Sequence, residues 1–259
     1  MKIEEIKEKL KSPEYDFLRT NSLLGNNIIL LGLGGSYAYG INIETSDIDI
    51  RGCFLNNKME ILLSDTSMHV TDASTDTILY SFNKIIQFLT SNNPNVLELF
   101  GLLPEHYLYI SDIGRELLNN KRLFLSKKCI LTFQGYALSQ LKNAEIESLE
   151  FINQSSRSKI AKYMMHTVRL YMMSIDILEK QQIVTYRYAD ERNLLLSIRN
   201  GEYLYEDGLP TIEFYNILEK YQTRFEYAKE HTDLPDNPDY KHINEFLASV
   251  NERIVKGEI

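Results

Sequence analysis

The stretch Gly34-Gly35-Ser36 constrains this chain more than any other part of its sequence. It follows residues 27–33, a short aliphatic run that predicts a buried strand. The glycines allow a tight turn and let backbone N–H groups come close to a ligand. Ser36 then stands where a short helix would begin, a position that favours a phosphate group. The stretch therefore predicts a strand–turn–helix unit that can hold a phosphate.

A pair of acidic residues, Asp47 and Asp49, follows after ten further residues. In a strand, side chains alternate between faces, so Asp47, Asp49 and Arg51 would share one face and Ile48 and Ile50 the other. Two carboxylates this close repel each other unless a cation lies between them, and Mg²⁺ prefers such oxygen ligands. Alone, the glycine turn is most often just a turn and the acidic pair a solvated strand face. Together they favour metal-assisted nucleotidyl transfer.

The spacing of these two motifs resembles the signature of the DNA polymerase beta-like nucleotidyltransferase superfamily. Other stretches narrow the resemblance to the RNA-repair-pathway polymerase beta family, over roughly residues 25 to 200. These stretches are residues 46–52, 80–82 and 93–99, and Lys162-Tyr163 with His166 and Arg169. The resemblance implies an α+β fold, with an N-terminal nucleotidyltransferase mixed β-sheet flanked by helices and a C-terminal all-helical domain.

The superfamily also places a third carboxylate on a later strand. Asp76 is the first candidate, because the residues after it, 77–82, match the family's context. Asp72, in the turn of an expected hairpin over residues 68–81, is the alternative. The simpler interpretation is that Asp76 is an exposed strand residue. Glu98 is a carboxylate inside an apolar run, so it either reaches the site or bonds a neighbouring backbone group.

The hydrophobic pattern of the sequence changes near residue 125, where strand-like runs give way to long helical patterns. We therefore expect a catalytic domain over residues 1–125 and a helical, substrate-binding domain over residues 126–259. In an expected helix from about residue 155 to 181, four residues share one face: Lys159, Lys162, His166 and Arg169. This face is interpreted as a wall that binds the triphosphate or the acceptor. The alternative is a solvated face whose charges pair with acids elsewhere.

Composition restricts the class of protein. The chain has 259 residues, 44% of them hydrophobic, which is ordinary for a globular protein. Its net charge of −8 disfavours a general nucleic-acid coat protein but allows a local basic patch. Cys53 and Cys129 match no metal spacing and are expected to be buried, reduced thiols, which suits a cytoplasmic protein. The charged N-terminus does not resemble a signal peptide, and no apolar run reaches membrane-spanning length.

The sequence thus predicts an enzyme that transfers a nucleoside monophosphate from a nucleoside triphosphate to a hydroxyl acceptor, with RNA as one acceptor. Asp47, Asp49 and Asp76 are expected to hold two Mg²⁺ ions, with Mn²⁺ as a substitute, and Gly35 and Ser36 to seat the phosphates. Two alternatives stay open. One is transfer of AMP to a protein or small molecule, and the other is a non-catalytic nucleotide-binding or antitoxin-like module. Nothing in the sequence identifies the base or the oligomeric state.

Overall fold

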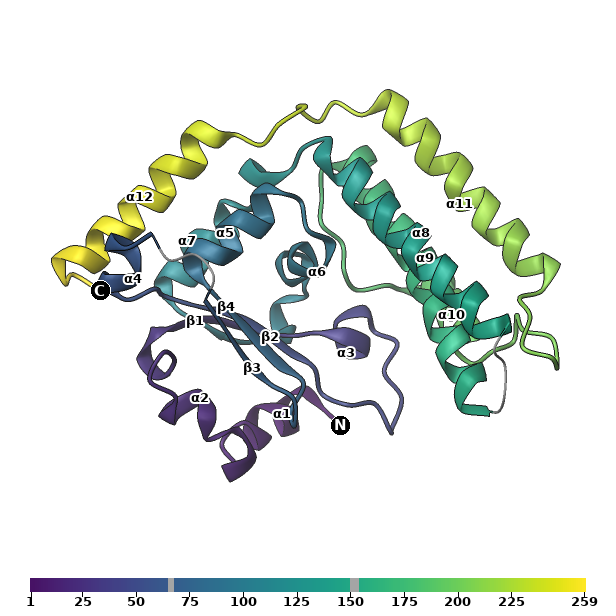
Figure 1. The fold of residues 1–259 in the computed structure, drawn as a ribbon, viewed down its shortest axis with the longest axis horizontal. Helices are drawn as coiled ribbons and strands as arrows, with labels where there is room; N and C mark the ends of the chain where they lie inside the picture. The colour runs from purple at the N-terminus through teal and green to yellow at the C-terminus, as the bar shows by residue number, and fades with distance from the viewer. Residues whose placement is uncertain (65–67, 150–153) are drawn as a thin grey trace.

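The computed structural model describes residues 1–64, 68–149 and 154–259. Within these ranges the chain forms a five-stranded mixed sheet in its first half and mainly helices in its second, which confirms the expected α+β fold (Figure 1). The helices, 3₁₀ helices (η) and strands are, in order, α1 (Ile3–Lys9), η1 (Pro13–Tyr15), α2 (Phe17–Thr20), η2 (Gly25–Asn27), β1 (Ile28–Leu33), α3 (Gly35–Tyr39), β2 (Ile50–Phe54), α4 (Lys58–Leu62), β3 (His69–Asp72), β4 (Thr77–Ser81), α5 (Phe82–Thr90), α6 (Pro94–Leu97), η3 (Glu98–Gly101), η4 (Pro104–His106), β5 (Tyr107–Ile110), α7 (Asp112–Asn119), η5 (Lys121–Phe124), α8 (Lys128–Leu149), α9 (Gln154–Lys180), α10 (Ala189–Arg199), α11 (Ile212–His231) and α12 (Tyr240–Lys256).

The sheet has the strand order β3-β4-β2-β1-β5. Only β2 and β4 run parallel among its pairings, and the other pairs are antiparallel. All six residues of β1 are buried, as its unbroken aliphatic run predicts for a strand covered on both faces. Helices α5 and α7 cover one face, and the α1–α2 segment covers the other (Figure 1). The hairpin expected over residues 68–81 is present as β3 and β4.

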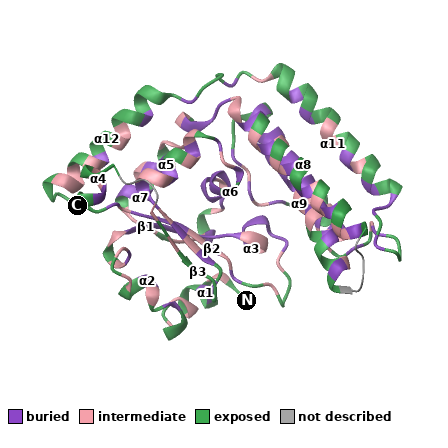
Figure 2. Cartoon of the chain, in the orientation of Figure 1, coloured by how far each residue is buried: buried purple, intermediate pink, exposed green. Residues whose placement is uncertain are grey.

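The helical half is built around α9, which packs against α8, α10 and α11. Its apolar stripe, which includes Ile160, Met164 and Val168, is fully buried, as the helical spacing predicts. Helices α11 and α12 form an outer arch whose outer side carries mostly exposed residues (Figure 2). Both cysteines are buried and free, which confirms that expectation.

The two halves share their packing. One apolar cluster contains residues of β1, α5 and α7 as well as residues of α8, α9 and α11. The last helix, α12, returns to the first half, where Phe246 packs edge-on against Phe82 and Arg253 forms an ion pair of 2.8 Å with Glu116. The division into domains at residue 125 stays a prediction. None of the described helices is long and apolar enough to cross a bilayer.

Candidate active site

The sheet topology brings two of the predicted carboxylates together. Strands β2 and β4 are parallel, and their register pairs Ile50 with Thr77. The residues just before these two, Asp49 and Asp76, therefore lie side by side at the same edge of the sheet. The backbone continues the ladder here, because the Ile50 N–H donates to the Asp76 carbonyl at 3.1 Å. Asp76 has a positive φ of 43°, a conformation that aspartate tolerates better than most residues.

The expectation that Asp47 and Asp49 lie on a strand is wrong. Strand β2 begins at Ile50, and Asp47 and Asp49 occupy the extended segment before it. Regular pairing of β2 begins at Ile50 because its neighbours stop there: β1 turns into α3 after Leu33, and β4 starts at Thr77. The Gly34 N–H still donates to the Asp49 carbonyl at 2.8 Å, which ties the segment to the glycine turn. Both carboxylates line one cavity, Asp47 as an exposed residue and Asp49 as a partly buried one.

The glycine turn lies directly against Asp49. Gly35 has a φ of +52°, and a Cβ added there would stand 1.7 Å from Asp49 Oδ2. This position therefore requires glycine on two counts, its backbone conformation and the close approach of a carboxylate. Gly35 and Ser36 both line the cavity at the first turn of α3.

Asp49 and Asp76 shift each other's pKa, with Arg51 as the neighbouring cation. Burial, followed by the hydrogen bond and the charge of Asp76, raises the pKa of Asp49 to about 7. The hydrogen bond from Asp49, together with Arg51, holds the pKa of Asp76 below its usual value. Arg51 Nη2 lies 3.1 Å from Asp76 Oδ1 and 3.6 Å from Asp49 Oδ1, and Arg51 Nη1 donates to the Asp76 carbonyl at 2.6 Å. Arg51 thus faces both carboxylates, and Lys162 across the cavity acts on both in the same direction.

Asp72, the alternative third carboxylate, lies elsewhere in the hairpin. Its side chain accepts hydrogen bonds from Ser74 Oγ and from the Thr75 N–H and Oγ1, so it organises the turn between β3 and β4. It is not among the residues that line the cavity, whereas Asp76 is. The geometry therefore favours Asp76 as the third carboxylate.

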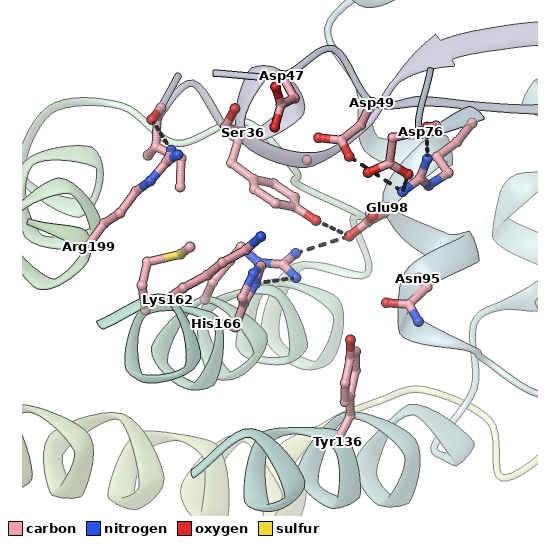
Figure 3. Close-up of a pocket in the computed structure, with 16 residues that line it drawn as sticks. Ser36, Asp47, Asp49, Asp76, Asn95, Glu98, Tyr136, Lys162, His166 and Arg199 are labelled. Atoms are coloured by element: carbon pink, nitrogen blue, oxygen red, sulfur yellow. Dashed lines mark hydrogen bonds and ion pairs between the residues drawn. The ribbon is translucent and has the colours of Figure 1, made fainter. Parts of the chain in front are cut away.

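Basic residues face the carboxylates from the helical half (Figure 3). Lys162 and His166 come from α9, and Arg199 comes from the last turn of α10. Arg199 Nη1 donates to the Ile41 carbonyl at 2.7 Å, and Arg192 Nε donates to the Gly40 carbonyl. These bonds attach the loop after α3 to the helical half. No pattern in the sequence indicates Arg199, because it lies far along the chain from every motif.

Lys159, the fourth residue of the predicted basic face, does not line this cavity. Its ammonium lies 3.6 Å from Glu147 of α8, and its side chain is 61% exposed. Lys159 lies seven residues before His166, so it is on nearly the same face of α9 but about 10 Å further along the helix axis, beyond the end of the cavity. This residue follows the alternative interpretation, a surface charge paired with an acid elsewhere.

Arg169 and Glu98 form a buried ion pair at the base of the cavity. Arg169 Nη1 donates to Glu98 Oε2 at 3.1 Å, and both residues are more than 90% buried. The Tyr39 hydroxyl also donates to Glu98 Oε2, and the Arg169 guanidinium lies 3.8 Å from the centre of the Tyr39 ring. Glu98 therefore reaches the site, and it does so as the partner of an arginine rather than as a free carboxylate. Sequence reasoning identified neither this pairing nor Tyr39.

The cavity has a volume of about 300 Å³. Figure 3 shows the three aspartates on one side and the α9 residues on the other, with Asn95 and Tyr136 toward the opposite end from Arg199. Asn95 and Tyr136 are further lining residues that the sequence did not indicate. Of the predicted site residues, the cavity gathers Gly35, Ser36, Asp47, Asp49, Asp76, Lys162, His166 and Arg169.

The carboxylates suit a divalent cation in their chemistry. Their oxygens are the donors that Mg²⁺ prefers, and a bound cation would favour the charged form of Asp49, whose pKa is raised by burial and by Asp76. As the chain stands, however, no group of three His, Cys, Asp or Glu side chains among the described residues is close enough to hold a metal ion. Asp76 is turned toward Arg51, and Asp47 is exposed at the edge. The donor set fits magnesium, and the two-ion site stays a prediction.

Comparison with known families gives one result for this chain. A model of the RNA repair pathway DNA polymerase beta family matches residues 3–249, which is nearly the whole sequence. The match confirms the resemblance that the motifs indicated over roughly residues 25 to 200 and extends it to residues 3–249. No curated protein matches the sequence.

Proposed function

Because the chain belongs to the RNA repair pathway DNA polymerase beta family, we propose that it transfers a nucleoside monophosphate from a nucleoside triphosphate to a hydroxyl acceptor, releasing pyrophosphate. The family is one of polymerase-beta-type nucleotidyltransferases. The observation that carries the proposal is a single cavity lined by the Gly35-Ser36 turn, three aspartates and the basic residues of α9 and α10. These are the parts that positioning and charge stabilisation of a phosphoryl group require.

The phosphates are expected at the end of the cavity that holds Ser36, Lys162 and Arg199. Gly35 leaves room for them, and the first N–H groups of α3 have no acceptor within the helix. Lys162 has no partner among the described residues, so its charge is available to a ligand. Arg169, in contrast, is already neutralised by Glu98.

The aspartates would hold the metal. Mg²⁺ bound by Asp47, Asp49 and Asp76 would lower the pKa of the acceptor hydroxyl and offset the charge of the leaving pyrophosphate. Burial and the neighbouring Asp76 raise the pKa of Asp49 to about 7, and a bound cation would lower it, so Asp49 would hold the cation as a carboxylate. Arg51 Nη2 donates a hydrogen bond to Asp76 Oδ1 and so orients that carboxylate. No side chain in the cavity is required as a covalent nucleophile.

The test is transfer of label from each of the four α-labelled nucleoside triphosphates. RNA is the first acceptor to try, because the family's description names RNA repair. A protein mixture and a panel of small hydroxyl compounds form the other arms. Asp47→Asn and Asp49→Asn should each abolish transfer while the fold is retained. Tight binding of Mg-nucleotide with label on no acceptor would instead favour a non-catalytic module.

A further inference from the structure

The cavity contains a histidine whose ring nitrogens have unequal surroundings. We propose that His166 binds the substrate as a neutral imidazole, held by Arg169 with its proton on Nε2, and donates that proton as a hydrogen bond to a phosphate oxygen. This inference rests on the proposed function for the identity of the ligand. The form of the imidazole itself follows from the contacts alone.

The contacts begin in the core. Glu98, only 7% exposed, accepts hydrogen bonds from both the Tyr39 hydroxyl and Arg169 Nη1. Arg169 is 2% exposed and also stacks on the Tyr39 ring. Its guanidinium is therefore fixed by an ion pair on one side and an aromatic face on another. Such a group has little freedom to turn toward a ligand.

Arg169 then fixes the imidazole. Arg169 Nη2 lies 3.3 Å from His166 Nδ1. A guanidinium nitrogen can only donate, so Nδ1 must be the acceptor and cannot carry a proton. The imidazole is then neutral, with its proton on Nε2. Nε2 has no hydrogen-bond partner within the described part of the chain, and His166 lines the cavity.

The surrounding charges act in the same direction. The groups that influence His166 are Arg169 and Lys162 on its own helix and Arg199 on α10, and all three are cations. Burial and these charges hold the pKa of His166 well below its usual value. The neutral form is thus maintained without a bound ligand.

These contacts exclude one role for His166 in the proposed reaction and allow another. His166 cannot accept a proton from the acceptor hydroxyl at either nitrogen, because Nδ1 is occupied and Nε2 is already protonated. It can donate one hydrogen bond to an oxygen of the triphosphate, beside the charges of Lys162 and Arg199. Its contribution should therefore not change with pH across the neutral range, unlike that of a histidine acting as a general base.

The direct experiment is ¹⁵N NMR of the imidazole in the full-length protein without nucleotide. We expect the proton on Nε2, one tautomer, and no titration between about pH 5.5 and 8.5. A proton on Nδ1, or titration within this range, would overturn the proposal. The measurement does not depend on catalysis, so it can fail while transfer is active or succeed while transfer is absent.

The link to Arg169 is tested by the double variant Glu98→Gln/Arg169→Met, which removes both buried charges together and leaves neither unpaired. His166 should then populate both tautomers, because burial still disfavours the charged imidazole but no donor keeps Nδ1 free of a proton. An unchanged imidazole spectrum in the folded double variant would refute the role of Arg169.

The link to the ligand is tested by binding of a nucleoside triphosphate and of inorganic tripolyphosphate. His166→Ala should weaken both by about tenfold, the loss of roughly one hydrogen bond to a charged group. His166→Gln, whose amide nitrogen can donate from a similar position, should stay within about threefold of the wild type. His242→Ala, an exposed histidine on α12, is the matched control and should not change binding. Equal losses for the alanine and glutamine variants would contradict a hydrogen-bonding role.

Discussion

Replacing Asp49 by asparagine should stabilise the metal-free protein while it abolishes transfer. Burial and the neighbouring Asp76 raise the pKa of Asp49 from 3.8 to about 7, so the folded protein binds this proton more tightly than the unfolded chain does. The contribution of this proton to the free energy of unfolding is therefore fully present below about pH 4 and is lost as the pH rises through about 7. Asparagine carries no charge at any pH and avoids this loss.

The magnitude can be bounded from the shift. About three pKa units correspond to a ceiling of about 4 kcal/mol. The side chain of Asp49 is 19% exposed and is hydrogen-bonded to Asp76, so screening and rearrangement reduce the effect to about 1–2 kcal/mol. For a chain of this size we expect a rise in Tm of about 3–6 °C at pH 8.

The assay is thermal unfolding of wild type and Asp49→Asn in chelator, at pH 5 and pH 8. The advantage of the variant should be larger at pH 8, and millimolar Mg²⁺ should raise the Tm of the wild type more than that of the variant. Asp47→Asn is the matched control. It also removes a predicted metal ligand, but Asp47 is exposed, so its Tm should change little. The reasoning is refuted if Asp49→Asn is no more stable than wild type at pH 8, or if its advantage grows toward pH 5.

Three further predictions concern the glycine turn, the basic face of α9 and a buried ion pair of the helical half. Gly35→Ala should lose nucleotide binding and about 1–3 kcal/mol of stability in chemical denaturation, because its Cβ would meet Asp49 and its φ is positive; a fully active, equally stable variant would show that the turn can rearrange. Lys162→Ala should weaken nucleotide binding by at least about tenfold and Lys159→Ala by less than about twofold, measured by titration calorimetry; equal effects would return Lys159 to the site. Arg187→Met should lower the free energy of unfolding by about 2–3 kcal/mol in urea, since it removes the buried partner of Asp176 at 2.6 Å and leaves the half-exposed Lys180 as the cation beside that carboxylate, and a loss below about 1 kcal/mol would contradict that burial cost.

Local patterns predicted the features that depend on neighbouring residues. The buried strand before Gly34, the hairpin of β3 and β4 and the apolar stripe of α9 all follow from periodicity and turn chemistry over short windows. Asp76 could be proposed because a family resemblance supplied the position of a third carboxylate. The parallel register of β2 and β4, which places it beside Asp49, is visible only in the fold.

The parts that escaped prediction depend on contacts between distant segments. Arg199 and Ile41 are 158 residues apart, and Glu98 and Arg169 are 71 apart. A helical stripe indicates which residues share a face, but not which neighbour that face meets. Lys159 and Arg169 show the difference, since one pairs with Glu147 at the surface and the other lies in the core.

The bonds from α10 to the loop after α3 bear on how substrates enter. Arg192 and Arg199 hold the carbonyls of Gly40 and Ile41, and the Arg187 N–H donates to the Tyr39 carbonyl at 3.1 Å. A wide hinge opening between the sheet and the helices would break all three bonds at once. Exchange of the proposed nucleotide would then proceed by side-chain movement at the rim of the cavity, around the exposed Asp47 and Lys162, with little change in the backbone.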